Sequence, residues 1–245
     1  MTGEGLRLAM WSGPRNISTA MMRSFGNRAD TIVVDEPLYG FYLAETGLDH
    51  PGRDEIVAAM ECDWRRVVDG LTAPVPQGRI HYQKHMTHHL LPVMDRDWLD
   101  DVVNCFLIRD PAEVVASYLE KRPEVTLADI GIREQAEIFE RTADRLGKAP
   151  PVVEGRDVQA DPEGTLRALC AALGIAFDSA MLSWPPGRRE TDGVWAPHWY
   201  GAVEASTGFS PPAPAKAPPP GFEALINEAR PHYERLRAHR LTGAA

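Results

Sequence analysis

Residues 8–22, LAMWSGPRNISTAMM, combine features that suit the binding of an anionic oxygen cluster. The apolar run Leu8–Trp11 predicts a buried strand, the Ser-Gly-Pro triplet breaks it, and apolar residues then recur at helical spacing. A helix N-terminus offers unpaired N–H groups and partial positive charge, to which this stretch adds Arg15 and the hydroxyls of Ser18 and Thr19. We therefore expect an anion-binding loop, although an ordinary strand-to-helix turn would use the same residues.

The loop departs from the phosphate-binding loop of ATP and GTP hydrolases. That motif, G-x-x-x-x-G-K-[ST], places a lysine directly before the hydroxyl residue, where it reaches the β- and γ-phosphates. Here Ile17 or Ser18 occupies the position of the lysine, depending on which hydroxyl is aligned. The cation stands instead at Arg15, three residues before Ser18. The stretch therefore predicts an anion site of a different kind.

A second stretch, VVNCFLIRDPAEVVASYLEKR, also joins a buried strand to a helix. The strand ends on Arg109, Pro111 suits the first turn of the helix, and Ser117 follows eight residues after the arginine. The hydroxyl of Ser117 would lie near the second helical turn, where it and Arg109 can share one anionic group. The other interpretation is that Arg109 pairs with Asp110 or Glu113 and that Ser117 only packs.

Candidate proton acceptors follow two further predicted strands. Glu36 comes directly after the second strand, Lys84 ends the third strand, and His85 and His88 follow it. An imidazole has an ordinary pKa of about 6.5, so near neutral pH it suits a general base better than an unperturbed glutamate does. We therefore favour the Lys84/His85/His88 cluster for catalysis, with Glu36 as acceptor anchor or alternative base. Histidines that cap a helix or face solvent would give the same pattern, and a metal site lacks an evident third ligand.

An alternation of short apolar strands and helices must position these residues. Such a pattern predicts an α/β fold with three layers, α/β/α, around a parallel sheet. Ligands bind outside the carboxyl ends of such strands, which is where the loop after Trp11, Glu36 and Arg109 all fall. The predicted strands are Leu6–Trp11, Thr31–Asp35, Arg79–Lys84, Val102–Arg109 and Pro151–Glu154. The predicted helices are Ile17–Asn27, Asp54–Leu71, Ala112–Arg122, Leu127–Leu146 and Pro162–Leu173.

After residue 182 the sequence becomes rich in glycine, proline and aromatic residues and shows little periodicity. We expect a single domain over residues 1–245, in which an irregular lid or tether segment, 183–220, precedes a C-terminal helical segment, 222–240. The stretch DGVWAPHWYG in the lid segment is typical either of a small-molecule pocket or of rings that cover an exposed side of the sheet. Pro231 is expected to kink or restart the last helix.

Composition narrows the classes of function. At 245 residues and 44% hydrophobic content, the chain can build one large core. A formal net charge of −9 argues against non-specific binding to nucleic acid and to an anionic membrane surface. The three cysteines lie far apart and are odd in number, and Cys105 and Cys170 stand in apolar patterns, which predicts buried, reduced thiols rather than a zinc site. Without an 18-residue apolar run or a charged-then-apolar leader, the sequence predicts a cytoplasmic protein.

The two anion-binding stretches together resemble the sulfotransferase family, whose members use 3′-phosphoadenosine 5′-phosphosulfate (PAPS) as the sulfuryl donor. Two sets of residues carry the resemblance, a loop for the 5′-phosphosulfate and a strand–helix motif for the 3′-phosphate. They are Pro14, Arg15, Ser18 and Thr19 for the loop, and Arg109, Asp110, Pro111 and Ser117 for the motif. The likeness extends over roughly residues 6–184, and it implies the P-loop NTPase-like fold of the family.

The resemblance also implies roles for single residues. Lys84 and the following histidines look like the family's Lys-Thr-His-Leu-Pro site, in which the lysine assists the sulfate and the histidine is the base. Glu36 stands in a Glu-Pro setting like that of the carbohydrate-modifying and bacterial branches. Arg188 and Arg189 are the nearest counterparts of a late Arg-Lys-Gly segment that contacts the 3′-phosphate.

The loop differs from the family pattern at three positions. Asn16 and Ile17 replace a Ser-Gly pair, and Ala20 stands where a tryptophan often stacks on the adenine. We still count Gly13 and Asn16 among the expected cofactor-binding residues, because both belong to the same loop.

These observations predict an enzyme that transfers a sulfuryl group from PAPS to a hydroxyl or amine of a small-molecule acceptor. Arg15, Ser18, Thr19 and helix N–H groups would stabilise the leaving phosphate. No metal is expected, because the transferred group carries less charge than in phosphoryl transfer. We expect no nucleic-acid or membrane partner, and a homo-oligomer stays open. The alternatives are a small-molecule kinase on a P-loop fold and a non-catalytic nucleotide-binding module.

Overall fold

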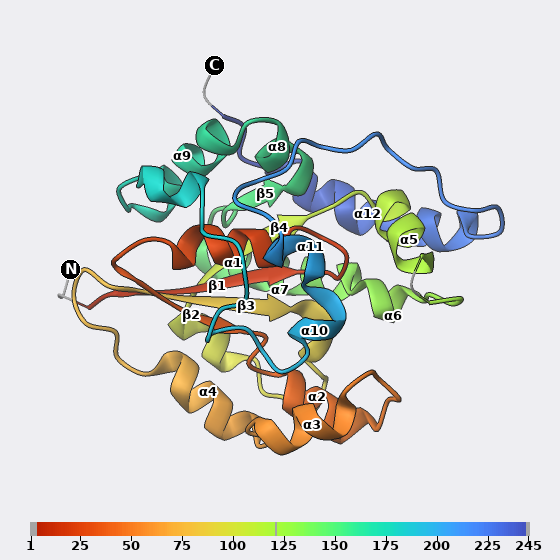
Figure 1. The fold of residues 1–245 in the computed structure, drawn as a ribbon, viewed down its shortest axis with the longest axis horizontal. Coiled ribbons are helices and arrows are strands. Elements are labelled where there is room, and N and C mark those ends of the chain that lie inside the picture. The colour runs from red at the N-terminus through yellow and green to blue at the C-terminus, as the bar shows by residue number, and fades with distance from the viewer. Residues whose placement is uncertain (1–3, 121, 244–245) are drawn as a thin grey trace.

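Within residues 4–120 and 122–243, which this computed structural model describes, five parallel strands form the centre of the molecule. The strands lie in the order β2-β3-β1-β4-β5, and helices cover both faces of the sheet (Figure 1). This confirms the predicted three-layer α/β/α class. The strands are β1 (Leu6–Ser12), β2 (Thr31–Asp35), β3 (Ile80–Met86), β4 (Val103–Ile108) and β5 (Val152–Glu154).

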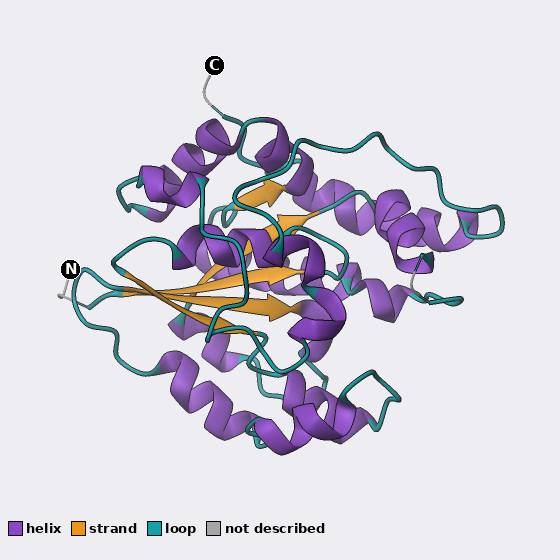
Figure 2. Ribbon diagram, viewed as in Figure 1, coloured by secondary structure: helices purple, strands orange, loops and turns teal. Residues whose placement is uncertain are grey.

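The helices surround the sheet and follow most of the strands in the chain, as Figure 2 shows. In the first half they are α1 (Ser18–Gly26), α2 (Tyr39–Thr46), α3 (Arg53–Ala59), α4 (Trp64–Thr72), α5 (Pro111–Leu119) and α6 (Leu127–Ile130). In the second half they are α7 (Ile132–Leu146), α8 (Gly155–Ala160), α9 (Pro162–Leu173), α10 (Ala196–Trp199), α11 (Gly201–Glu204) and α12 (Glu223–Arg237). In the part of the chain that the structure describes, none of these helices has the length and apolar character needed to cross a bilayer.

β1 supplies buried side chains to both faces of the sheet, because successive residues of a strand point in opposite directions. Leu8 and Met10 pack with α1 and α9 on one face, whereas Ala9 and Trp11 pack with α5, α7 and α12 on the other. All four side chains are fully buried. The carboxyl end of β1 is therefore held rigidly between its neighbours β3 and β4, and the loop that follows starts from a fixed point.

Helix termini follow local sequence signals, which explains where the predicted helices were right and where they were wrong. Asp161 caps α9 and Gly174 ends it with a φ of 69°, as predicted. The helix predicted over 54–71 is two helices, because Asp63 caps a new helix by accepting a hydrogen bond from the N–H of Arg65. The prediction missed α2 and α8, and the segment expected to be irregular contains the short helices α10 and α11. The helix expected to kink or restart at Pro231 runs unbroken through that residue.

The helix predicted over 127–146 is also two helices, α6 and α7, which meet at Gly131. Gly131 has a φ of 68°, a left-handed conformation that strains residues with a side chain. Its carbonyl accepts a hydrogen bond from Oγ1 of Thr87 at 2.8 Å, so the break also holds the segment that follows β3. This segment, the 3₁₀ turn Thr87–His89, carries two of the histidines discussed below.

Substitution of Gly131 by Ala is expected to destabilise the protein more than the same change at Gly147. Both glycines have left-handed φ values, 68° and 65°, so each alanine costs about 1–2 kcal/mol of backbone strain. A Cβ at Gly131 would lie 2.5 Å from Oγ1 of Thr87, whereas a Cβ at Gly147 meets nothing within 4 Å. We expect Gly131→Ala to cost about 1–3 kcal/mol more, as overpacking does, in urea unfolding. Equal losses for the two variants would contradict the crowding seen at Gly131.

Candidate active site

The loop between β1 and α1, residues 13–17, is held in place by Asn16. Oδ1 of Asn16 accepts a hydrogen bond from the N–H of Ile17 at 2.8 Å, and Nδ2 donates to the carbonyl of Leu107 in β4 at 3.2 Å. Arg15 has a left-handed φ of 57°, which is unusual for a residue with a side chain. Because Ile17 supplies no side-chain cap, the N–H groups of the first turn of α1 stay available to an anion.

The two predicted anion-binding stretches are in direct contact. Nε of Arg15 donates to Oγ of Ser117 at 3.0 Å, and the carbonyl of Arg15 accepts a hydrogen bond from Nη1 of Arg109. Arg109 also donates to Glu113 at 3.2 Å, so the pairing that the sequence left open exists beside this contact. Asp110 instead caps α5 through its side chain. Residues 102 positions apart in the chain, Arg15 and Ser117, thus form one polar surface.

A cavity of about 220 Å³, the smaller cavity, lies beside this contact and is lined by Arg109, Ser117, Arg156 and Lys216. Arg156 pairs with Glu113 at 2.5 Å, and Lys216 pairs with Glu120 at 2.5 Å. Arg156 and Lys216 were not predicted for this site. Lys216 had a recognisable signal, since it is the cation of the proline-rich stretch SPPAPAKAPPPGF.

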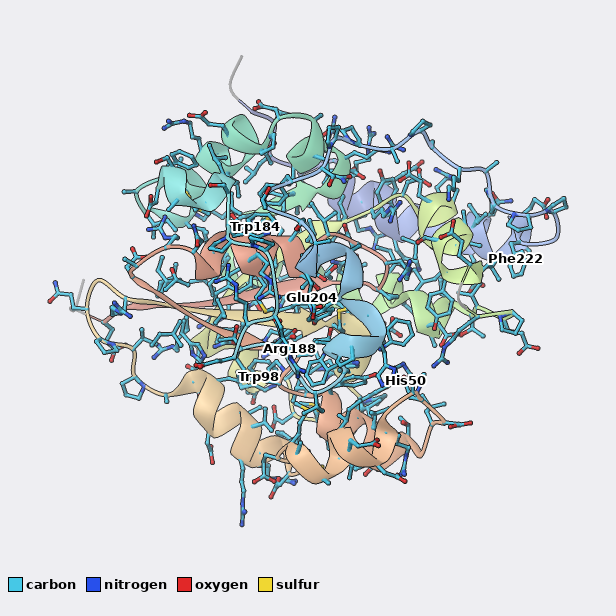
Figure 3. All side chains as sticks on the ribbon, in the orientation of Figure 1. His50, Trp98, Trp184, Arg188, Glu204 and Phe222 are labelled. Atoms are coloured by element: carbon cyan, nitrogen blue, oxygen red, sulfur yellow. The ribbon has the colours of Figure 1, made fainter. Side chains whose placement is uncertain are left out.

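Arg188 and Arg189, expected to join Arg109 and Ser117, lie on a different segment and do not line the smaller cavity. Arg188 is exposed on the segment between Leu182 and α10 (Figure 3). Arg189 donates to the carbonyl of Pro185 at 3.3 Å. Neither side chain lines the two cavities described here. The chain runs through the segment of Arg188 and Arg189 first and then turns back toward α5, which brings Lys216 to the smaller cavity.

A cavity of about 400 Å³, the larger cavity, connects the loop after β1 to the ends of β2 and β3. Its wall on one side is the loop and the first turn of α1: Pro14, Arg15, Asn16, Ile17, Ser18, Thr19 and Ala20. The rest of its lining is rich in aromatic rings and imidazoles: Tyr39, Tyr42, His50, His88, His89, Tyr118, Trp195, Trp199 and Tyr200. The aromatic stretch of the lid segment therefore lines a pocket, one of the two interpretations the sequence allowed.

Glu36 and Lys84 also line the larger cavity and belong to a buried ionic cluster. Nζ of Lys84 donates to Oδ1 of Asp35 at 2.8 Å, to Oε1 of Glu36, and to the hydroxyl of Tyr200 at 2.9 Å. Tyr200 in turn donates to Oδ2 of Asp35 at 2.7 Å. All three ammonium hydrogens of Lys84 are thereby used within the protein, and they orient the Glu36 carboxylate at the cavity surface.

The cluster changes the acidity of its members. Burial raises the pKa of Glu36, and the neighbouring charge of Asp35 raises it further, although Lys84 acts in the opposite direction. Burial by itself would lower the pKa of Lys84, but Asp35 and Glu36 outweigh it and hold that pKa well above its usual range. Lys84 is therefore a permanent cation, and Glu36 is a carboxylate with more than ordinary basicity. The left-handed φ of 44° at Glu36 marks it as a position where the backbone is strained.

His85 points away from the larger cavity. Its ring stacks on Trp11 with centroids 4.3 Å apart, and Nε2 lies 3.2 Å from Oε1 of Gln83. Only 1% of His85 is exposed, and burial lowers its pKa to about 3. The expectation that His85 could act on an acceptor is therefore not supported by its position, because the ring belongs to the apolar core on the other face of the sheet.

His88 and His89 do line the larger cavity. Burial lowers the pKa of His88 to about 4 and holds that of His89 well below its usual range, so both rings are neutral at pH 7. The ring of His89 stacks between Tyr39 and Tyr42, with centroids 4.6 and 4.7 Å away. Across residues 4–120 and 122–243, no three His, Cys, Asp or Glu side chains gather in a way that could hold a metal ion.

Comparison with known families decides which proteins this chain is related to. A family model described as a sulfotransferase domain matches residues 6–240. The chain belongs to the sulfotransferase family. Two Arabidopsis thaliana proteins, branched-chain-amino-acid aminotransferase-like proteins 1 and 2, are 38% identical to this chain over 232 residues and 35% identical over 231. Each match covers 94% of this chain but 41% of the relative, so the chain spans less than half of their length.

Solved structures share the fold. The sulfotransferase domain of the Synechococcus PCC 7002 olefin synthase has a TM-score of 0.54 at 20% identity, and the match covers 97% of this chain and 96% of that domain. The sulfotransferase domain of the curacin biosynthetic pathway has a TM-score of 0.50 at 15% identity, over 96% of this chain and 98% of that domain. These likenesses confirm the predicted sulfotransferase fold.

The buried, neutral His85 is expected to make stability fall as the pH is lowered. Its folded pKa of about 3 lies below its unfolded value, so the stabilisation is complete above about pH 6.5 and is lost as the pH falls toward the folded pKa. His85→Phe keeps a ring against Trp11 but cannot titrate. Between about pH 6 and pH 4 the free energy of unfolding should decline less steeply in this variant, by about 1.4 kcal/mol per pH unit. Parallel pH profiles in urea unfolding would show that His85 does not carry this effect.

Proposed function

We propose that this sulfotransferase transfers a sulfuryl group from PAPS to a hydroxyl or amine of a small molecule bound in the larger cavity. The observation that carries the proposal is that one cavity is lined both by the anion-binding loop and by the Glu36–Lys84 pair. The loop suits the 5′-phosphosulfate, and the Glu36–Lys84 pair suits an acceptor that must lose a proton. The donor and the acceptor would therefore meet in a single space.

The smaller cavity has the chemistry that a second phosphate needs. Arg109, Arg156 and Lys216 supply charge-assisted donors, and Ser117 adds a hydroxyl next to Arg15. We therefore propose that the smaller cavity binds the 3′-phosphate, while Gly13, Pro14, Arg15, Asn16, Ser18 and Thr19 hold the 5′ side of PAPS. Arg15 lines the larger cavity and contacts Ser117 and Arg109 of the smaller one, so it is placed to stabilise the charge that develops on the leaving phosphate.

We propose Glu36 as the general base. Its carboxylate lies at the surface of the larger cavity, burial raises its pKa, and Lys84 fixes its orientation. The acceptor O–H or N–H proton would pass to Glu36 as the acceptor atom forms its bond to sulfur and the sulfur–oxygen bond to the phosphate breaks. Lys84 would then act as a positioning residue rather than on the sulfate. His88 is a weaker choice, because a pKa of about 4 makes it a poor proton acceptor.

Glu36→Gln keeps the shape of the side chain but removes the base, so kcat is expected to fall roughly 10²–10⁴-fold. In the unaltered protein kcat should rise with pH through the pKa of Glu36, because the base acts in its deprotonated form. Since burial raises that pKa, the rise should lie above the ordinary glutamate value of about 4.3. Steady-state kinetics with saturating PAPS across the pH range would measure both effects.

The matched comparison is His88→Gln, in the histidine cluster that the sequence favoured. This variant should keep most of its kcat and the same acidic limb. If His88→Gln loses the limb while Glu36→Gln retains it, the base is His88 and the assignment to Glu36 is wrong.

The product nucleotide, 3′-phosphoadenosine 5′-phosphate, is expected to bind more tightly than AMP, which lacks the 3′-phosphate. Arg109→Ala and Lys216→Ala should each reduce this preference about tenfold or more, because each removes a charge-assisted contact. Arg188→Ala and Arg189→Ala, matched for charge, should leave it unchanged. Calorimetry of both nucleotides with the four variants tests this directly.

Two results would turn the proposal toward the alternatives. Binding of ATP with Mg²⁺ in preference to the 3′-phosphorylated nucleotide would favour the small-molecule kinase. Tight binding of that nucleotide, without transfer to any compound in a metabolite extract supplied with labelled PAPS, would favour the non-catalytic module.

A further inference from the structure

Arg122 is a cation on the wall of the larger cavity that makes no ion pair or side-chain hydrogen bond with any residue the structure describes. It follows the end of α5, one turn after Tyr118, and its charge acts on the rings of Tyr39, Tyr42 and His50. Asp129 lines the same cavity, but no ion pair joins the two side chains, and Asp129 accepts hydrogen bonds within its own capping box. A guanidinium placed in this way has donors to offer to a bound molecule.

The other cations of the larger cavity are engaged elsewhere. Lys84 is paired with Asp35 and Glu36, whereas Arg15 lies in the loop, donates to Ser117 and is assigned above to the nucleotide. Arg122 belongs instead to the side of the cavity formed by α2 and the turn after β3. Its charge acts on Tyr39 of α2 and on His50, and His50 lies beside α2 and α3 (Figure 3). The side of the cavity away from the loop therefore carries a guanidinium without an ion-pair partner among the described residues, with the carboxylate of Asp129 on the same wall.

The imidazoles on this side add neutral polar atoms. Nδ1 of His88 and Nδ1 of His89 are buried and have no hydrogen-bond partner among the described residues. Their low pKa values leave both rings uncharged at pH 7, as does the pKa of about 4 at His50. Arg122 is therefore the positive group of this side, and the rings around it provide apolar surface. An entirely apolar molecule would cover the guanidinium without pairing it, which is unfavourable.

We propose that Arg122 binds a carboxylate-type oxyanion of the acceptor, so that the acceptor is a hydroxy or amino acid with an apolar or aromatic body. The reacting hydroxyl or amine lies toward Glu36, the apolar body lies among the aromatic rings, and the anionic end lies at Arg122. This assignment rests on the proposed function only in calling the bound molecule an acceptor. The binding of the acid to the cavity is a separate property and is measured separately.

The test compares 3-(4-hydroxyphenyl)propanoate with its methyl ester, which has the same body without the charge. With the protein saturated by 3′-phosphoadenosine 5′-phosphate, calorimetry should show that the acid binds roughly 10- to 100-fold more tightly than the ester, the range of a charge-assisted pair. Arg122→Gln should remove this difference by weakening the acid alone, and Arg122→Lys should retain part of it. Arg66→Gln, the same change at an exposed position of α4, should leave it intact.

Sulfuryl transfer to the same pair is a second, independent measurement. The acid should show the lower KM, and Arg122→Gln should raise that KM with little change in kcat. A preference in binding without turnover would support the anion site and count against the proposed function. Turnover of the ester at least equal to that of the acid would overturn the anion site while leaving the proposed function standing. Failure of the acid to bind at millimolar concentration, or a loss of nucleotide affinity in Arg122→Gln, would also overturn it.

Discussion

The buried hydrogen-bonded cluster of Asp35, Glu36, Lys84 and Tyr200 is the interaction on which the rest of the site depends. It joins the ends of β2 and β3 to the lid segment, because Tyr200 and the N–H of Gly193 both donate to Oδ2 of Asp35. Charges withdrawn from water are stable only when every partner is present, and removal of one typically costs about 3–5 kcal/mol. The same contacts therefore fix the position of the Glu36 carboxylate and hold the aromatic wall of the larger cavity against the sheet.

The pleat of β3 decides which of its polar residues can take part in chemistry. The predicted strand ended at Lys84, which left His85 outside it and free to face a substrate. The strand continues to Met86, so His85 lies within it, opposite Trp11 of β1, and alternation directs the imidazole into the core on the other face. Because the pairing of β3 extends two residues beyond Lys84, Lys84 and His85 point to opposite faces of the sheet, and Lys84 lines the larger cavity whereas His85 does not. Sequence patterns define strand ends poorly because pairing with adjacent strands, rather than local preference, sets them.

Contacts within a single strand–loop–helix unit were predictable, whereas contacts that depend on the path of the lid segment were not. The loop around Arg15 and the motif of Arg109 and Ser117 follow from residues close in sequence and from the order of a parallel sheet. Lys216 lines the smaller cavity with Arg109 because the proline-rich segment turns back across α5. That segment has no periodic sequence pattern from which its path could be predicted. The basicity of Glu36 and the neutrality of His88 likewise arise from burial, which local sequence does not report.

The distribution of charge explains how an acidic protein can gather cations at one place. The chain carries a formal net charge of −9, yet the smaller cavity is lined by three cations, Arg109, Arg156 and Lys216, which pair with Glu113 and Glu120 of the same lining. Exposed charges farther apart than about 8 Å are largely screened at physiological ionic strength, so the excess of carboxylates elsewhere has little effect on these positions. Glu113 pairs with both Arg109 and Arg156, which keeps the two guanidinium groups side by side despite their mutual repulsion. The acidic residues beside the site thus pre-organise its basic ones, and the local field rather than the net charge determines which ligand the surface accepts.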